Sequence, residues 1–197
     1  MRAVHVAISE AQLRERRQLD LDRLDEMWEG ELHMVPPPSF DHQDVVGELY
    51  AFLRAEVKRR GPGKVIPGAG VHEPSDPEHS YRVPDLSYVA GGNAGVIQER
   101  GIVGPADAVI EVRSPGDETY EKFPFFAGLG IREVVVIDRD TRRPEAYRLA
   151  GKQYLAVAPA PDGWVTAEVL GVRLRRLPDR DVLRVEALDN PGRWTEI

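Results

Sequence analysis

The sequence predicts an α/β fold in one domain, 1–197, built on a mixed, antiparallel-rich sheet flanked by helices. Three observations lead to this prediction. An apolar stripe with helical spacing lies between Asp41 and Gly61. The segment 132–138 carries a continuous apolar run, which is typical of a strand in a sheet covered on both faces. From Tyr147 on, short aromatic and β-branched runs separated by Gly and Pro predict three or four antiparallel strands.

The composition is that of a soluble globular protein, with 197 residues, 42% hydrophobic and 30% charged. The absence of cysteine excludes thiol catalysis, Cys-ligated zinc and disulfides. A net charge of −7 argues against a surface that attracts nucleic acid everywhere, although local basic patches remain compatible with it. The N-terminal segment is too short and too soon charged for a signal peptide, and no apolar run could span a bilayer. We therefore expect a cytoplasmic protein.

The N-terminal part is expected to contain a helix, a hairpin and a second helix. Ser9–Gln12 has the spacing of a capping box and predicts a short helix through about Arg17. A hairpin turning near Gly30 follows, and Pro36–Pro38 ends it because proline cannot donate to a sheet.

The long helix has Asp41 as its expected N-cap and Gly61 as its stop. His42 falls in the first turn of this helix. A histidine there is usually exposed and structural, but His42 lies in the segment that leads away from the expected site, so its role stays open. Glu48 is expected on the solvated face. The apolar stripe consists of Val46, Leu49, Phe52, Leu53 and Val57.

A central core, about 64–138, carries two acidic residues on predicted strands. Asp85 lies in the strand 82–89, and Glu111 lies among Ala, Val and Ile in the strand 106–115. Burying a lone carboxylate costs several kcal/mol or shifts its pKa, so Glu111 needs a cation, a donor or water beside it. If Asp85 lies on a neighbouring strand, the cation that we expect between the two carboxylates is a metal ion.

Two carboxylates with the backbone carbonyl of Val112 form an oxygen site suited to Mg²⁺ or Mn²⁺. Lys122 begins the next helix, because Pro124 is tolerated only in a first turn, and it can point back to orient or deprotonate water. Arg113 shares the face of Glu111 and can hold a phosphate, but it cannot act as a base. A structural ion-pair network would use the same side chains, and the residues alone do not separate the two.

Other polar segments have plainer interpretations. The loop 72–79 holds two His and three carboxylates, yet without regular spacing it is expected to be a solvated hairpin connection. The segment Gly91–Gly95 matches no nucleotide-binding loop. The arginines in 139–148 and 173–184 are expected to be solvated charges that permit phosphate contact.

The order of several short motifs closely resembles the Uma-two family of endonucleases, within the PD-(D/E)xK restriction-endonuclease-like superfamily. The resemblance covers roughly 24–149 and rests on Pro84-Asp85, Glu111–Pro115, Glu121-Lys122, Phe126-Ala127, Gly130–Glu133 and Val136–Asp138, with Glu26–Leu32 and His42 upstream. It implies a restriction-endonuclease-like fold and a Mg²⁺-dependent nuclease core. Asp85 and Glu111 match its acidic ligands, Lys122 matches a lysine carried on the helix, and Glu26 and His42 match further family positions.

Two departures accompany the resemblance. Arg113 stands at the superfamily's usual lysine position, which leaves the role of base to Lys122. Phe126 stands where the family often has Tyr, which removes a hydroxyl near the site. Neither change affects the acidic ligands.

The expected function is metal-dependent hydrolysis of DNA by a homodimer, because many nucleases act on two strands. The alternative is a non-catalytic protein of the same fold that binds nucleic acid or assembles through the arginines of 173–184. A glycosidase that uses two carboxylates fits poorly, since it needs no lysine and requires an aromatic groove.

Overall fold

The computed structural model describes residues 3–19 and 21–197, which form a mixed α/β fold with three sheets. In chain order the elements are β1 (Val4–Ala7), α1 (Glu10–Gln18), β2 (Glu26–Trp28), β3 (Glu31–Met34), α2 (Phe40–Arg60), β4 (Lys64–Pro67), β5 (Val71–His72), β6 (Tyr81–Arg82), β7 (Leu86–Val89), the 3₁₀ turn η1 (Gly91–Val96), β8 (Ile97–Gln98), β9 (Gly101–Val103), β10 (Ala108–Arg113), the 3₁₀ turn η2 (Tyr120–Lys122), α3 (Phe123–Leu129), β11 (Glu133–Asp138), β12 (Pro144–Ala150), β13 (Gln153–Ala156), β14 (Val165–Ala167), β15 (Val172–Arg176), β16 (Leu183–Ala187) and β17 (Asn190–Glu196). The predicted α/β class is confirmed.

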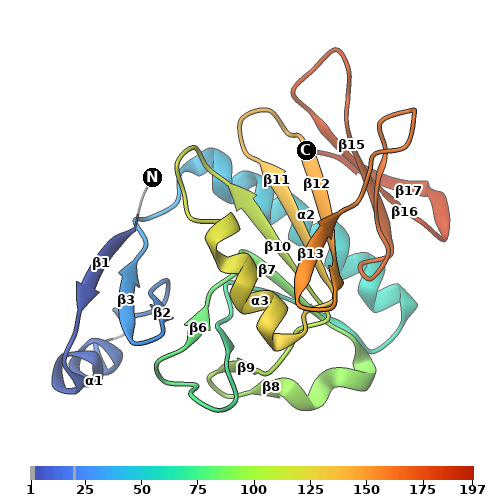
Figure 1. Ribbon diagram of the computed structural model, residues 1–197. Coiled ribbons are helices and arrows are strands. Elements are labelled where there is room, and N and C mark those ends of the chain that lie inside the picture. Colours follow the sequence, from blue (N-terminus) through green and yellow to red (C-terminus); the bar gives the residue numbers. More distant parts are fainter. Residues whose placement is uncertain (1–2, 20) are drawn as a thin grey trace.

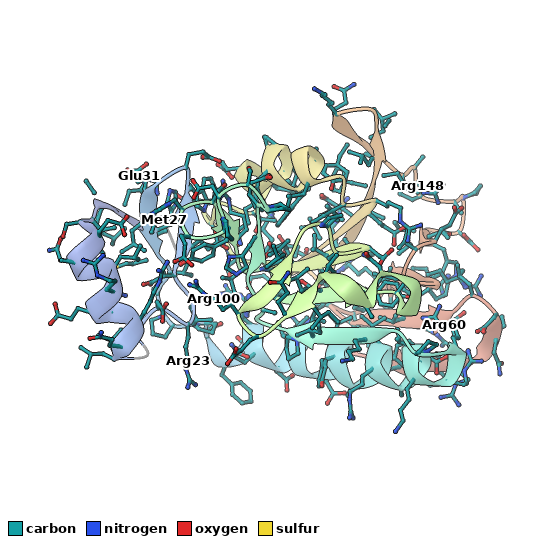
Figure 2. All side chains as sticks on the ribbon, turned by 90° about the horizontal axis from the view of Figure 1, so that it is seen from below. Arg23, Met27, Glu31, Arg60, Arg100 and Arg148 are labelled. Atoms are coloured by element: carbon teal, nitrogen blue, oxygen red, sulfur yellow. The ribbon has the colours of Figure 1, made fainter. Side chains whose placement is uncertain are left out.

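A six-stranded sheet in the order β13-β12-β11-β10-β7-β4 forms the centre of the molecule. The pair β10–β11 is parallel and is joined through α3, whereas the other pairs are antiparallel. The helices α2 and α3 cover opposite faces of this sheet (Figures 1 and 2). Because side chains alternate along β10, Ile110 packs with the α2 side and Val109 with the α3 side. The expected sheet covered on both faces is therefore present.

A second sheet, in the order β1-β3-β2-β6-β5-β9-β8, carries the N-terminal segments. Its β2–β3 hairpin turns at Glu29 and Gly30, which have φ values of 49° and 90°, as a tight two-residue turn requires. The helix α1 begins with the predicted capping box at Ser9 and packs Leu13 against Met27. Figure 1 shows these segments at one end of the molecule, away from the C-terminal strands. The hairpin and the first helix are confirmed.

Three boundaries differ from the prediction. The expected strand 82–89 is two strands in different sheets, β6 and β7, with Asp85 in the crossing between them, because Pro84 cannot donate to a ladder. The N-cap of α2 is Ser39, not Asp41: the Ser39 hydroxyl accepts a hydrogen bond from the His42 backbone. The strand β10 is also shorter than the expected 106–115.

The C-terminal part has more strands than expected. The strands β12 and β13 extend the central sheet, while β14–β17 form a separate four-stranded antiparallel sheet. The segment 72–79 does connect two antiparallel strands, β5 and β6, but its His72 is buried instead of solvated. None of the helices in the described residues is long and apolar enough to cross a membrane.

Candidate active site

A cleft of about 550 Å³ opens where the two larger sheets meet the N-terminal end of α2. It is lined by five of the residues singled out in the sequence: Glu26, His42, Asp85, Glu111 and Lys122. Val112 also lines it. The fold thus brings together groups that are up to 96 positions apart in the chain, Glu26 and Lys122 being the most distant.

Lys122 lies at the junction of η2 and α3, where Pro124 occupies the first turn as predicted. Its Nζ is 2.8 Å from Glu26 Oε1 and 3.2 Å from Glu111 Oε1. All three side chains are largely buried, with exposed fractions of 13%, 3% and 5% respectively. Lys122 therefore points into the protein, between a carboxylate on β2 and a carboxylate on β10.

Asp85 is fixed from two sides. Its Oδ2 accepts a 2.7 Å hydrogen bond from the Val112 backbone N–H and lies 3.3 Å from His42 Nε2. Burial lowers the pKa of His42, but the hydrogen bond and the negative charge of Asp85 outweigh burial, so the pKa of His42 is raised. Within residues 3–19 and 21–197, no group forms a hydrogen bond with the buried Nδ1 of His42. The first turn of α2 is thereby bound to the Asp85 crossing.

Three acidic side chains, Glu26, Asp85 and Glu111, lie around Lys122 at the bottom of the cleft. Burial raises the pKa of Glu111, Lys122 opposes that rise, and the charges of Asp85 and Glu26 add to it. Burial also favours neutral Lys122, but Glu111 and Glu26 outweigh it and raise the pKa of Lys122. The ammonium is thus held in its charged form, as a donor beside three acids. This surplus of carboxylate oxygens fits a hard divalent cation such as Mg²⁺ or Mn²⁺.

Comparison with known proteins assigns the chain to a family. The family model for Uma2, described as "Putative restriction endonuclease", matches residues 13–179. The chain belongs to the Uma2 family. A solved structure, titled a "putative nuclease belonging to DUF820 from Anabaena variabilis ATCC 29413", shares the fold with a TM-score of 0.59 at 19% identity, over 74% of this chain and 82% of that chain. No curated protein matches the chain in sequence.

Arg113 stands apart from the cleft of this Uma2 protein. Its guanidinium lies 2.7 Å from the carboxylate of Asp138 and over the ring of Tyr120, and it is not among the residues that line the cleft. The structure therefore does not bring Arg113 together with Lys122, although both follow Glu111 closely in the sequence.

Arg139 lies in the cleft, although the sequence pattern predicts a solvated charge at this position. It lines the cleft, where Nη1 lies 3.5 Å from the hydroxyls of Ser39 and Ser114. The position of Arg139 in the chain indicates its place in the cleft. Arg139 directly follows β11, and the carboxyl end of β11 lies beside the carboxyl end of its parallel neighbour β10. Residues at that shared edge meet in space.

The arginines of 173–184 are engaged within the C-terminal sheet of the Uma2 fold. Arg173 and Arg184 both bond to Glu186, and Arg175 stacks on Trp164. Arg176 and Arg180 pair with Asp181 and Glu196, respectively. Their charges are therefore largely matched by neighbouring carboxylates.

Proposed function

We propose that this Uma2 chain is a metal-dependent endonuclease that hydrolyses DNA phosphodiester bonds. The observation that carries the proposal is the convergence of Asp85, Glu111 and Lys122 in one cleft, with an excess of buried carboxylate. Family membership supports a nuclease, and the chemistry of the donors supports a divalent cation.

Asp85, Glu111 and the Val112 carbonyl would hold Mg²⁺ or Mn²⁺. Such an ion lowers the pKa of bound water and neutralises charge that develops on a phosphate. Glu26 holds Lys122 in place through its 2.8 Å contact, and the Val83 and Trp28 N–H groups fix Glu26 in turn.

Lys122 would orient the attacking water or donate to a phosphate oxygen. Its place between two carboxylates favours the ammonium form, which donates and does not accept a proton. Both arginines pair with a neighbouring aspartate, Arg113 with Asp138 and Arg139 with Asp140, but only Arg139 of the two lines the cleft, so it is better placed to hold the DNA backbone. The sequence-based role of a phosphate clamp is thus proposed for Arg139.

Nicking of supercoiled plasmid tests this proposal. Wild-type protein is expected to nick in Mg²⁺ or Mn²⁺, while Asp85→Asn and Lys122→Met should lose activity by about 10²-fold or more. Glu48→Gln is the matched control, because Glu48 lies exposed on α2 outside the cleft and should leave the rate unchanged. Absence of nicking in either metal, or equal nicking by Asp85→Asn, would contradict the proposal.

The proposal includes a symmetric dimer, since cleavage of both strands of a duplex calls for two sites related by a two-fold axis. Light scattering during gel filtration tests it directly. A mass of twice 22.0 kDa is expected, and a monomer at all concentrations would refute the dimer without affecting the nicking result.

A further inference from the structure

A row of polar side chains crosses the N-terminal strands on the face opposite α1. In the register of β1, β3 and β2, His5 lies opposite His33, and His33 lies opposite Glu26. Alternating residues such as Met27 and Leu32 pack against α1 on the other face. The row leads from the cleft residue Glu26 outward to β1.

Glu118 meets both histidines from the segment that precedes η2. One of its oxygens lies 2.7 Å from His5 Nε2, and the other lies 3.1 Å from His33 Nδ1. One ligand atom from each residue can be chosen so that all three lie within 4.8 Å of one another. Three segments separated by as many as 113 positions therefore converge on one point.

The donor set is that of a transition-metal site. The centroids of the two imidazole rings are 3.9 Å apart, and an imidazole nitrogen that carries no proton presents a lone pair to a metal ion. Two imidazole nitrogens with one carboxylate are a common ligand set for Zn²⁺, with a further position left for water. This differs from the oxygen donors of the Asp85 cleft.

The orientation of His33 is supported by its surroundings. Its ring is stacked on Trp28 at 4.2 Å, and it is 3% exposed. Its Nε2 lies 4.0 Å from Glu31, which is too far for a hydrogen bond, so the stack on Trp28 and the 3.1 Å contact of Nδ1 with Glu118 hold the ring in place.

We propose that His5, His33 and Glu118 form a second metal site, selective for a transition ion such as Zn²⁺. The site fastens β1 to the segment that carries Lys122, four positions after Glu118. Glu118 itself lines the cleft, and Trp28, stacked on His33, donates to Glu26. Binding at this site therefore orders the wall of the cleft without contributing a ligand to the Asp85 centre.

Calorimetric titration of tag-free, metal-stripped protein with Zn²⁺ tests the site, in excess Mg²⁺ to occupy the oxygen centre. Wild type is expected to bind one Zn²⁺ per chain. His5→Ala should raise the dissociation constant for Zn²⁺ by about 10- to 100-fold or more, because loss of an outer-shell partner alone has an effect of that size. His5 is 41% exposed, so this variant keeps the fold. His79→Ala is the matched control: His79 is 37% exposed and also contacts two carboxylates, but it lies outside the cluster.

A second readout separates the two centres. Co²⁺ bound to imidazole nitrogen gives a visible absorption band, which should persist in Asp85→Asn and disappear in His5→Ala and Glu118→Gln. Equal Zn²⁺ affinity in wild type and His5→Ala would overturn the proposal, as would a band that disappears in Asp85→Asn alone. Neither assay measures nuclease activity, so the result stands apart from the plasmid test.

Discussion

Replacing Lys122 by Met removes the positive charge that lies between Glu26 and Glu111 and keeps the length of the side chain. The Lys122 ammonium lies 2.8 Å from Glu26 and 3.2 Å from Glu111, and both contacts are buried. The variant therefore leaves these two acids without their positively charged partner. Breaking a buried pair in this way costs about 3–5 kcal/mol. For a chain of this size that corresponds to a fall in Tm of about 6–20 °C.

Urea unfolding in chelator and in Mg²⁺ measures this cost. In chelator the variant should lose about 3–5 kcal/mol of unfolding free energy relative to wild type. In Mg²⁺ the difference should narrow, because a bound dication supplies positive charge beside the same carboxylates. Lys152→Met is the control: Lys152 is exposed in a turn, and its loss should change stability by no more than about 0.5 kcal/mol.

Two results would refute this reasoning. If Lys122→Met were no less stable in chelator than Lys152→Met, the ammonium would not be the counter-ion of the buried acids. If Mg²⁺ stabilised wild type and variant equally, the ion would not bind beside Glu111.

Other parts of the structure give three more predictions. Arg139→Met should reduce nicking about tenfold by removing a charged phosphate contact, with Mg²⁺ affinity unchanged in calorimetry; an unaltered rate would exclude that contact. Replacing Arg176 and Arg180 by Gln should leave nicking intact, because both lie outside the cleft and pair with Asp181 and Glu196 at the surface, whereas lost DNA retardation with intact metal binding would favour a non-catalytic module. Glu56→Gln should lower the free energy of unfolding by about 1–3 kcal/mol. It should also make that free energy less dependent on pH in the acid range. Burial raises the pKa of Glu56, but two arginines outweigh it and lower the pKa, so wild type gains stability above the ordinary Glu pKa and loses it as pH falls through the lowered value. Urea unfolding across that pH range checks this, and parallel curves for the two proteins would contradict it.

The central part of the site could be predicted because its residues lie in or next to regular elements with clear local signals. Glu111 is conspicuous inside an apolar strand, and Pro124 fixes where the helix after Lys122 begins. The position of Asp85 was harder to predict. A strand pattern from 82 to 89 does not reveal that the chain changes sheets at Pro84, since that depends on pairing with distant strands.

Contacts between distant segments account for what the sequence did not show. The strand β1 has four residues and is positioned by pairing with β3 and by the contact of His5 with Glu118. Glu118 meets His5 and His33 only because the N-terminal sheet packs beside the segment before η2. Arg139 was grouped with neighbouring arginines, although its position after β11 carries it to the cleft.

The most direct test of the central claim is the anomalous scattering of a crystal soaked in Mn²⁺. The account predicts a manganese peak in the cleft, within about 2.0–2.6 Å of carboxylate oxygens from both Asp85 and Glu111. A cleft without such a peak, in a crystal where Mn²⁺ is bound elsewhere on the protein, would contradict it.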